Sequence, residues 1–351
     1  MNPFRQRLPD GPLDIVGDVH GELEALLKVL HRLGCDPERG TADRPVVFVG
    51  DLVDRGPNSP GVVELFIRLR EAGIAWGVAG NHEINLMVKA NKSGGGWSYG
   101  DSTDGWQRRD GEHVPYGSVM ASEEQVATYR SAFEAMPLIL ERDDLRVVHA
   151  AWMDTAVEAL PMEGDAGAMM QQRGQEIWNE LKESKIAAAY RSLYEEYKGF
   201  KVLNLRPPEV FAAAQKVALT SQNRNPVKVL TSGVEQPADQ VRFLGEKWRF
   251  VKRHRWWDAY GPGPACVIGH YWRPRGRRNS DPIWDGIDRY GWFGRHRNVF
   301  CVDYCVGRRF RERVERPGQP FEGGLAALRW PERTLIFDDR DEAIPTTGYR
   351  S

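Results

Sequence analysis

The stretch that decides the fold is Leu13–Gly21, with the sequence LDIVGDVHG. Its first four residues form a short β-rich run, which predicts a buried strand, and Asp18 and His20 follow where that strand ends. Because these two residues are two apart in an extended segment, their side chains can lean the same way. Glycines on either side permit a sharp turn. The stretch therefore predicts a strand end that presents a carboxylate and an imidazole together.

Two further apolar runs have the same design. Pro45–Val49 leads into GDLVDRG, which ends at Gly56, and Ile74–Ala79 leads into GNHE, which begins at Gly80. Each run is followed by a helical pattern, and the spacing of about 30 residues is that of one β-α unit. In an open α/β sheet, ligands bind outside the carboxyl ends of the strands. The polar residues of the three motifs are therefore expected at one common edge.

The residue types at that edge suit divalent metals. Carboxylate, imidazole and amide groups together are borderline ligands for manganese, iron or zinc. Asp51 follows the middle strand and Asn81 follows the next one along the chain. A carboxylate has two oxygens, so Asp51 could bridge two ions about 3.5–4 Å apart.

GDVHG, GDLVDRG and GNHE, in this order, resemble the metal-binding signatures of the calcineurin-like metallophosphoesterases. More narrowly, they resemble the phosphoprotein-phosphatase branch, which includes bacterial Ser/Thr phosphatases and dinucleoside-tetraphosphate hydrolases. The resemblance implies an α/β fold, a four-layered α/β/β/α sandwich with a helical, Trp/Arg-rich insert. The expected division is 1–153 for the first half of the core, 154–262 for a helical, basic and aromatic insert that acts as a cap or lid, 263–337 for the second half, and 338–351 for a polar tail.

Later motifs extend the resemblance. His149 ends an apolar run at a point where the family has a metal-binding histidine, although Ala151 stands where a glycine is usual. His270 lies in a Gly-His motif after another apolar run. The nuclease and phosphodiesterase branch has a second histidine where this chain has Trp272, so the phosphatase branch is favoured. Asp303 is interpreted as a supporting or structural residue.

The resemblance also implies a role for each motif residue. Metal 1 takes Asp18, His20 and Asp51, and metal 2 takes Asp51, Asn81, His149 and His270. His82 is the general acid, Asp54 pairs with it, and Arg55 holds phosphate. A second phosphate-binding arginine has three candidates, which are Arg253, Arg255 and Arg273. The cofactors are two divalent metal ions, with Mn²⁺ preferred and iron or zinc as alternatives.

Two segments each allow two interpretations. The loop at 93–117 is rich in Gly, Ser and Asp and carries scattered aromatic residues. A loop this long either borders the site or has no fixed structure. The basic and aromatic run at 245–258 is either a solvated face of a helical cap or a lid that brings guanidinium groups to a phosphate.

Composition narrows the function classes. The chain has 351 residues, and 48 Lys+Arg against 49 Asp+Glu give a net charge of -1, which does not favour nucleic acid. Four cysteines make no disulfide framework in so long a chain; Cys266, Cys301 and Cys305 are expected to be small buried side chains. No stretch approaches a membrane span of about 20 apolar residues. The expectation is a soluble cytoplasmic protein without a membrane partner.

The leading hypothesis is a metal-dependent phosphatase that hydrolyses phosphate monoesters, phosphoproteins included, through a hydroxide activated by two metals and a histidine acid. One alternative is a hydrolase of dinucleoside polyphosphates such as Ap4A, or of other nucleotides. Another, from a different class, is a non-catalytic metal-binding regulatory protein. The expected partners are a phosphorylated small molecule, a nucleotide or a phosphoprotein.

Overall fold

The computed structural model describes residues 2–108, 110–184, 186, 188, 208–244, 247–276 and 281–350. One sheet contains β2 (Leu13–Val16), β5 (Val46–Phe48), β6 (Ala75–Gly77), β15 (Ala326–Trp330), β16 (Thr334–Phe337) and β17 (Ile344–Pro345). Its strand order is β17-β16-β15-β2-β5-β6. A second sheet contains β1 (Arg5–Arg7), β9 (Ile139–Arg142), β10 (Leu145–Val148), β13 (Ala265–Ile268) and β14 (Val299–Cys301), in the order β1-β9-β10-β13-β14.

Parallel pairing sets the position of the motifs. In the first sheet β2 pairs with β5 and β5 with β6, each in parallel. In the second sheet β10 pairs with β13 and β13 with β14, also in parallel. Parallel neighbours have their carboxyl ends at the same edge, so each sheet gathers its motif loops at one edge.

The two sheets pack face to face. Leu13 and Ile15 of β2 lie in one apolar cluster with Leu145 and Val147 of β10, whereas Val16 belongs to the cluster on the helical side. This alternation follows from the period of two in a strand. Full burial of such a side chain stabilises the fold by roughly 1.5–3 kcal/mol.

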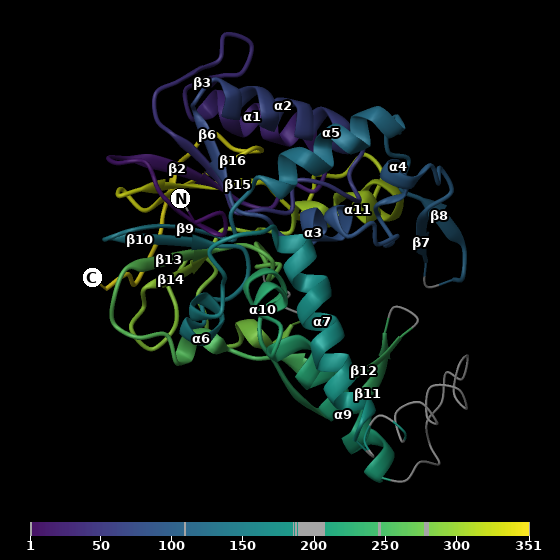
Figure 1. Ribbon diagram of the computed structural model, residues 1–351. Helices are drawn as coiled ribbons and strands as arrows, with labels where there is room; N and C mark the ends of the chain where they lie inside the picture. The colour runs from purple at the N-terminus through teal and green to yellow at the C-terminus, as the bar shows by residue number, and fades with distance from the viewer. Residues whose placement is uncertain are drawn as a thin grey trace.

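Helices cover the outer faces of both sheets (Figure 1). α1 (Leu23–Arg32), α2 (Ser59–Glu71) and α5 (Glu123–Glu134) lie on the side of β2 and β6, and α6 (Asp154–Glu158) and α10 (Pro226–Ser232) lie on the side of β13 and β14. α5 begins with a capping box, in which Ser122 and Gln125 exchange hydrogen bonds. The layers are therefore helix, sheet, sheet and helix, as predicted.

The segment 154–262 is only partly helical. After α7 (Ala166–Lys182), α9 (Pro208–Asn223) and α10 come two paired strands, β11 (Glu235–Leu244) and β12 (Lys247–Arg253), and a short 3-10 helix at Trp256–Asp258. Residues 247–250 alternate between charged and apolar types, and this period of two is typical of a strand. Residues 189–207 of this insert, which was expected to be helical, lie outside the described residues.

The loop at 93–117 has structure of its own. It follows α3 (Asn81–Met87) and contains α4 (Gly96–Tyr99) and a hairpin of β7 (Gly105–Gln107) and β8 (His113–Pro115). Shorter elements elsewhere are β3 (Cys35–Asp36), β4 (Thr41–Ala42), α11 (Arg309–Glu315) and the 3-10 helices Pro282–Trp284 and Val306–Arg308. The cysteines expected to be buried are buried. Among the described helices, none has the length and apolar character needed to cross a bilayer.

Candidate active site

The carboxyl ends of the two parallel strand sets meet at one site. Two predicted ligands follow β2, one follows β5 and one begins α3, after β6. From the other sheet, one follows β10 and one follows β13. In chain order these residues are Asp18, His20, Asp51, Asn81, His149 and His270.

Asp51 lies at the centre of this cluster. Its Oδ2 is 3.4 Å from His149 Nε2 and 3.8 Å from the Nε2 atoms of both His20 and His82. Two groups therefore share Asp51, one with His20 and His82 and the other with His149 and His270. Within each group the potential ligand atoms lie within 4.8 Å of one another, so each group could hold a metal ion.

Asp18 and Asn81 close the cluster around His270. The His270 backbone N–H donates to Asp18 Oδ2 at 3.0 Å, and His270 Nδ1 is 2.9 Å from the Asn81 side-chain amide. The approach of Asp18 requires a glycine at position 269, because a Cβ on Gly269 would overlap Asp18 Oδ1. The structure thus brings all of the predicted metal ligands together.

Backbone carbonyls orient two of the histidines. His20 Nδ1 lies 3.2 Å from the Val53 carbonyl oxygen, and His149 Nδ1 lies 2.8 Å from that of Val49. When Nδ1–H donates to a carbonyl, the other ring nitrogen presents its lone pair to the site. His149 Nε2 is buried and has no hydrogen-bond partner among the described residues. A buried nitrogen of this kind, facing a carboxylate, fits a metal ligand.

Burial and mutual charge perturb these groups. Burial, reinforced by the negative charge of Asp303, raises the pKa of Asp18 well above its ordinary value. Burial alone would also raise the pKa of Asp51, but the charges of His149 and His82 outweigh it and lower that pKa well below the usual range. Burial would lower the pKa of His149, but the charge of Asp51 raises it to about 10. Two buried carboxylates in contact with imidazoles call for compensating positive charge, which a divalent cation supplies.

Several site residues have a left-handed backbone. The angle φ is 48° at His20, 51° at Asp51, 76° at Asp54, 71° at Arg55 and 66° at His270. Such a conformation costs of order 1–3 kcal/mol at a non-glycine residue and persists only where surrounding contacts impose it. The occurrence of this conformation at several residues of one edge indicates a functional site.

Glu83 supplies part of the contacts that impose this backbone. The side chain is fully buried, and it accepts hydrogen bonds at 2.8 Å from the backbone N–H groups of Asp51, Leu52 and Gly80. One carboxylate thereby joins the loop after β5 to the loop after β6. Glu83 is part of the GNHE motif, but no role was predicted for it.

The predicted pairing of His82 with Asp54 is present. His82 Nδ1 lies 2.5 Å from Asp54 Oδ2, and both side chains are buried. The Arg55 guanidinium spans two imidazoles, with Nη1 2.9 Å from His20 Nε2 and Nη2 3.1 Å from His82 Nε2. It also stacks over Trp272 at 5.0 Å from the ring centroid. The His82 imidazole, a member of one candidate metal group, is therefore in contact with a carboxylate and a guanidinium group.

The three candidate arginines differ in position. Arg273 is 1% exposed and donates to the Cys301, Asp288 and Gly291 carbonyls, which speaks against the substrate role considered for it. Arg255 donates to backbone carbonyls of 282–285.

Arg253 contacts Tyr271, the residue that follows His270 in the chain. It is 3.3 Å from Asp281 Oδ2, and its guanidinium stacks on the Tyr271 ring at 5.3 Å. Burial lowers the pKa of His270 well below its ordinary value, and the Arg253 charge lowers it further. Of the three candidates, Arg253 is thus the arginine whose charge reaches this edge.

Two supporting residues complete the site. Asp303, after β14, accepts hydrogen bonds from the Trp272 N–H at 2.7 Å and the Cys305 N–H at 2.8 Å, in keeping with the supporting role expected for it. Trp97, in the loop at 93–117, donates its indole N–H to Asp54 Oδ1 at 2.7 Å. That loop does border the site, although the sequence did not single out Trp97.

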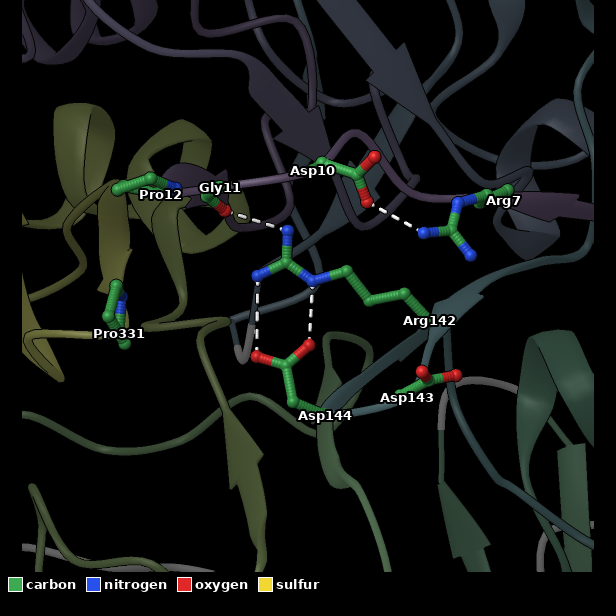
Figure 2. Close-up of a pocket in the computed structure, with 8 residues that line it drawn as sticks. All are labelled: Arg7, Asp10, Gly11, Pro12, Arg142, Asp143, Asp144 and Pro331. Atoms are coloured by element: carbon green, nitrogen blue, oxygen red, sulfur yellow. Dashed lines mark hydrogen bonds and ion pairs between the residues drawn. The ribbon is translucent and has the colours of Figure 1, made fainter.

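A cavity of about 400 Å³ lies elsewhere (Figure 2). Pro12 and Asp144 in its wall come just before β2 and β10, so it lies at the amino ends of strands whose carboxyl ends carry the site. Figure 2 shows the Arg142 guanidinium between the Gly11 carbonyl and the Asp144 carboxylate. None of the predicted site residues lines this cavity.

Comparison with known sequences identifies the family of this chain. The chain matches the family model described as calcineurin-like phosphoesterase over residues 11–233. It is 45% identical over 86 residues to the asymmetrical bis(5'-nucleosyl)-tetraphosphatase PrpE of Oceanobacillus iheyensis, covering 23% of this chain and 34% of the relative. It is 32% identical over 143 residues to PrpE of Bacillus velezensis, covering 39% and 55%. With serine/threonine-protein phosphatase 1 of Salmonella typhimurium it shares 37% identity over 101 residues, covering 28% and 43%.

These matches span between about a third and about half of the length of the curated relatives. Among solved structures, a cold-active protein-tyrosine phosphatase of Shewanella aligns over 97% of this chain and 83% of its own, with a TM-score of 0.47 and 15% identity. The family model covers well over half of the chain and includes all three glycine-flanked motifs. The chain belongs to the calcineurin-like phosphoesterase family.

Proposed function

We propose that this protein is a metal-dependent phosphatase that hydrolyses phosphate monoesters, phosphoproteins included. The observation that carries the proposal is the position of Asp51, which lies between two groups of potential metal ligands. His82 belongs to one of these groups, and Asp54 and Arg55 lie directly beside His82. A purely structural metal site has no need of an imidazole–carboxylate pair and a guanidinium at its open side.

The proposed metal ligands are those of the two groups, except that Asp18 takes the place of His82 in the first group and Asn81 is added to the second. One cation would be held by Asp18, His20 and Asp51, and the other by Asp51 with Asn81, His149 and His270. Two divalent cations would supply positive charge that stabilises the phosphoryl oxygens and lowers the pKa of water. The mixture of nitrogen and oxygen ligands suits Mn²⁺, with iron or zinc as alternatives.

The remaining residues bind the phosphate and move a proton. Arg55 presents a planar set of N–H donors, which suits two oxygens of a phosphoryl group. Arg55 Nη2 lies 3.1 Å from His82 Nε2 and can only donate to it, so a phosphate that takes over this N–H donor lies beside the imidazole and leaves Nε2 free to carry a proton. His82 then donates its Nε2 proton to the leaving oxygen, and Asp54 holds Nδ1–H and stabilises the protonated ring. The second phosphate-binding arginine is Arg253, brought to the site by β12.

The segment 154–262 is proposed to be the lid of the site. Arg253 ends β12, and the β11–β12 pair belongs to this segment. The guanidinium of Arg253 contacts Tyr271, which follows the proposed ligand His270 directly in the chain. A substrate that reaches His270 therefore also meets a residue of this segment.

A second candidate is the hydrolysis of dinucleoside polyphosphates. It is favoured by the relatives, several of which are named bis(5'-nucleosyl)-tetraphosphatases. The same pair of cations could act on a phosphoanhydride, and aromatic residues such as Trp272 could stack on a base. A non-catalytic regulatory protein that only binds metal is the alternative of another class.

Steady-state turnover with a substrate panel tests the proposal. Purified protein, stripped of metal and reloaded with Mn²⁺, Zn²⁺ or Mg²⁺, is assayed with p-nitrophenyl phosphate, a phosphoserine peptide and Ap4A. We expect metal-dependent hydrolysis that is abolished in Asp51→Asn. A higher kcat/KM for Ap4A than for the monoesters would select the second candidate. Metal binding without turnover of any substrate would refute both and leave the regulatory alternative.

A further inference from the structure

We infer that Trp97 is a positioning residue, which orients the Asp54 carboxylate and through it the His82 imidazole. The inference rests on the proposed function and adds a residue to its machinery. Trp97 Nε1–H donates to Asp54 Oδ1 at 2.7 Å, and the other oxygen, Oδ2, is 2.5 Å from His82 Nδ1. The two contacts form one chain from indole to carboxylate to imidazole.

The hydrogen bond from Trp97 fixes the plane of the Asp54 carboxylate, which the contact with His82 alone cannot do. The terminal torsion of an aspartate is broad, so one hydrogen bond does not define the plane of its carboxylate. A donor on each oxygen removes this freedom. The Asp54 backbone N–H also donates to Ser59 Oγ at 2.9 Å, so the main chain of Asp54 is held as well. Trp97 therefore completes the restraint on the partner of His82.

Trp97 is itself rigidly held. Its side chain is 1% exposed, and its ring packs against Tyr129 of α5 with the centroids 6.2 Å apart. Its carbonyl accepts the Ala121 N–H at 3.0 Å. A donor anchored in this way to a neighbouring helix can impose a direction on a more mobile carboxylate.

Hydrogen bonds of the glycine turn before Trp97 connect this segment to the site. Asp104 Oδ2 accepts the N–H groups of Gly94 at 2.7 Å and Gly96 at 2.8 Å. The Gly94 carbonyl in turn accepts the Arg55 N–H at 3.0 Å. This segment thus holds the neighbouring Asp54 and Arg55 together, through a side chain and a main chain.

Kinetics of Trp97→Phe test the inference, because phenylalanine keeps an aromatic ring and loses the N–H donor, and its smaller volume is matched in a control variant. Trp330→Phe is the matched control: its indole also donates to a carboxylate, Asp144 Oδ2, at 2.8 Å, and Asp144 lines the distant cavity of Figure 2. We expect kcat for phenyl phosphate to fall about tenfold in Trp97→Phe, a part of the 10²–10⁴ that a general acid supplies. KM and the Trp330→Phe control should stay within about twofold of the wild type.

The leaving group separates positioning from general damage. p-Nitrophenolate needs little help from an acid, whereas phenolate needs a proton. Trp97→Phe should therefore lose several-fold more kcat with phenyl phosphate than with p-nitrophenyl phosphate, and adding it to His82→Asn should cost nothing further. Equal losses on the two substrates, or no loss in a protein whose His82→Asn variant is slow, would overturn the inference and leave the proposed function standing.

A second readout needs no turnover. In metal-free protein with ¹⁵N-labelled tryptophan, the Trp97 indole resonance is identified by its loss in Trp97→Phe. We expect Asp54→Ala to shift this resonance to the position of a free indole and to leave the Trp330 resonance in place. An unshifted Trp97 resonance would overturn the inference. Absence of metal-dependent turnover in the wild type would instead refute the proposed function, and the resonance would still decide whether Trp97 holds Asp54.

Discussion

Asp14 is a buried acid whose charge should destabilise the fold as the pH rises. It lies opposite Arg329 in the β2–β15 pair, 1% exposed, with its Oδ1 3.3 Å from Arg329 Nε. Neither carboxylate oxygen has a hydrogen-bond partner among the described residues. Burial, only partly offset by the Arg329 charge, raises the pKa of Asp14 from 3.8 to about 6.

The direction and size of the effect follow from this pKa. An acid whose pKa is higher in the folded state favours folding while it is protonated, and this contribution is lost as the pH rises through the window from about 4 to about 6. A difference of about two pKa units corresponds to about 3 kcal/mol. Asp14→Asn has no charge to bury, so its free energy of unfolding relative to the wild type should rise by up to about 3 kcal/mol across that window.

Urea unfolding at several pH values from 4.5 to 7.5 measures this difference. Asp101→Asn is the control, because hydrogen bonds from Thr103 lower the pKa of the exposed Asp101 below its ordinary value, so this carboxylate stays ionised throughout the assayed range. With rising pH, the stability of the wild type should stay constant relative to Asp101→Asn and fall relative to Asp14→Asn. A difference between Asp14→Asn and wild type that stays constant with pH would show that Asp14 is not desolvated in the fold, and the reasoning would be wrong.

Three further predictions concern the site. Glu83→Gln should weaken metal binding about 10–100-fold in a calorimetric titration, which is the usual cost of losing a partner behind a metal ligand. Glu312→Gln also loses a buried acceptor of backbone N–H groups, and it should leave metal binding unchanged. Equal effects of the two substitutions would contradict the role of Glu83. His82→Asn should lower kcat about 10²-fold or more with normal metal content, and a protein that lost metal would instead make His82 a ligand. Arg253→Gln should raise KM for phosphate monoesters about tenfold, of the order of one charged hydrogen bond, while Arg255→Gln should not. A larger rise in KM for Arg255→Gln than for Arg253→Gln would show that Arg255 is the second phosphate-binding arginine.

Local sequence patterns predicted the framework of the fold correctly. The apolar runs that become β2, β5, β6, β10 and β13 are short and β-rich, and in each case the polar motif follows where the strand ends. Such runs are buried on both faces, so their character is visible without knowledge of the partners. The parallel order of the strands then brings the motifs to one edge.

Features that depend on distant contacts were not predicted. Nothing in the local sequence distinguishes Trp97 from other tryptophans, because its role comes from an aspartate more than 40 residues earlier in the chain. Arg273 was considered as a phosphate-binding residue, but aromatic rings and backbone carbonyls enclose it. The strand β12 was missed because of its basic composition, although the alternation at residues 247–250 was readable.

The central claim is that one carboxylate, that of Asp51, is shared by two cations. Titration of metal-free protein with Mn²⁺, followed by electron paramagnetic resonance, tests it most directly. The account predicts two ions per chain with a magnetically coupled spectrum in the wild type, and loss of the coupled signal in Asp51→Asn. A wild type that binds a single ion, or an Asp51→Asn variant that still shows a coupled pair, would contradict it.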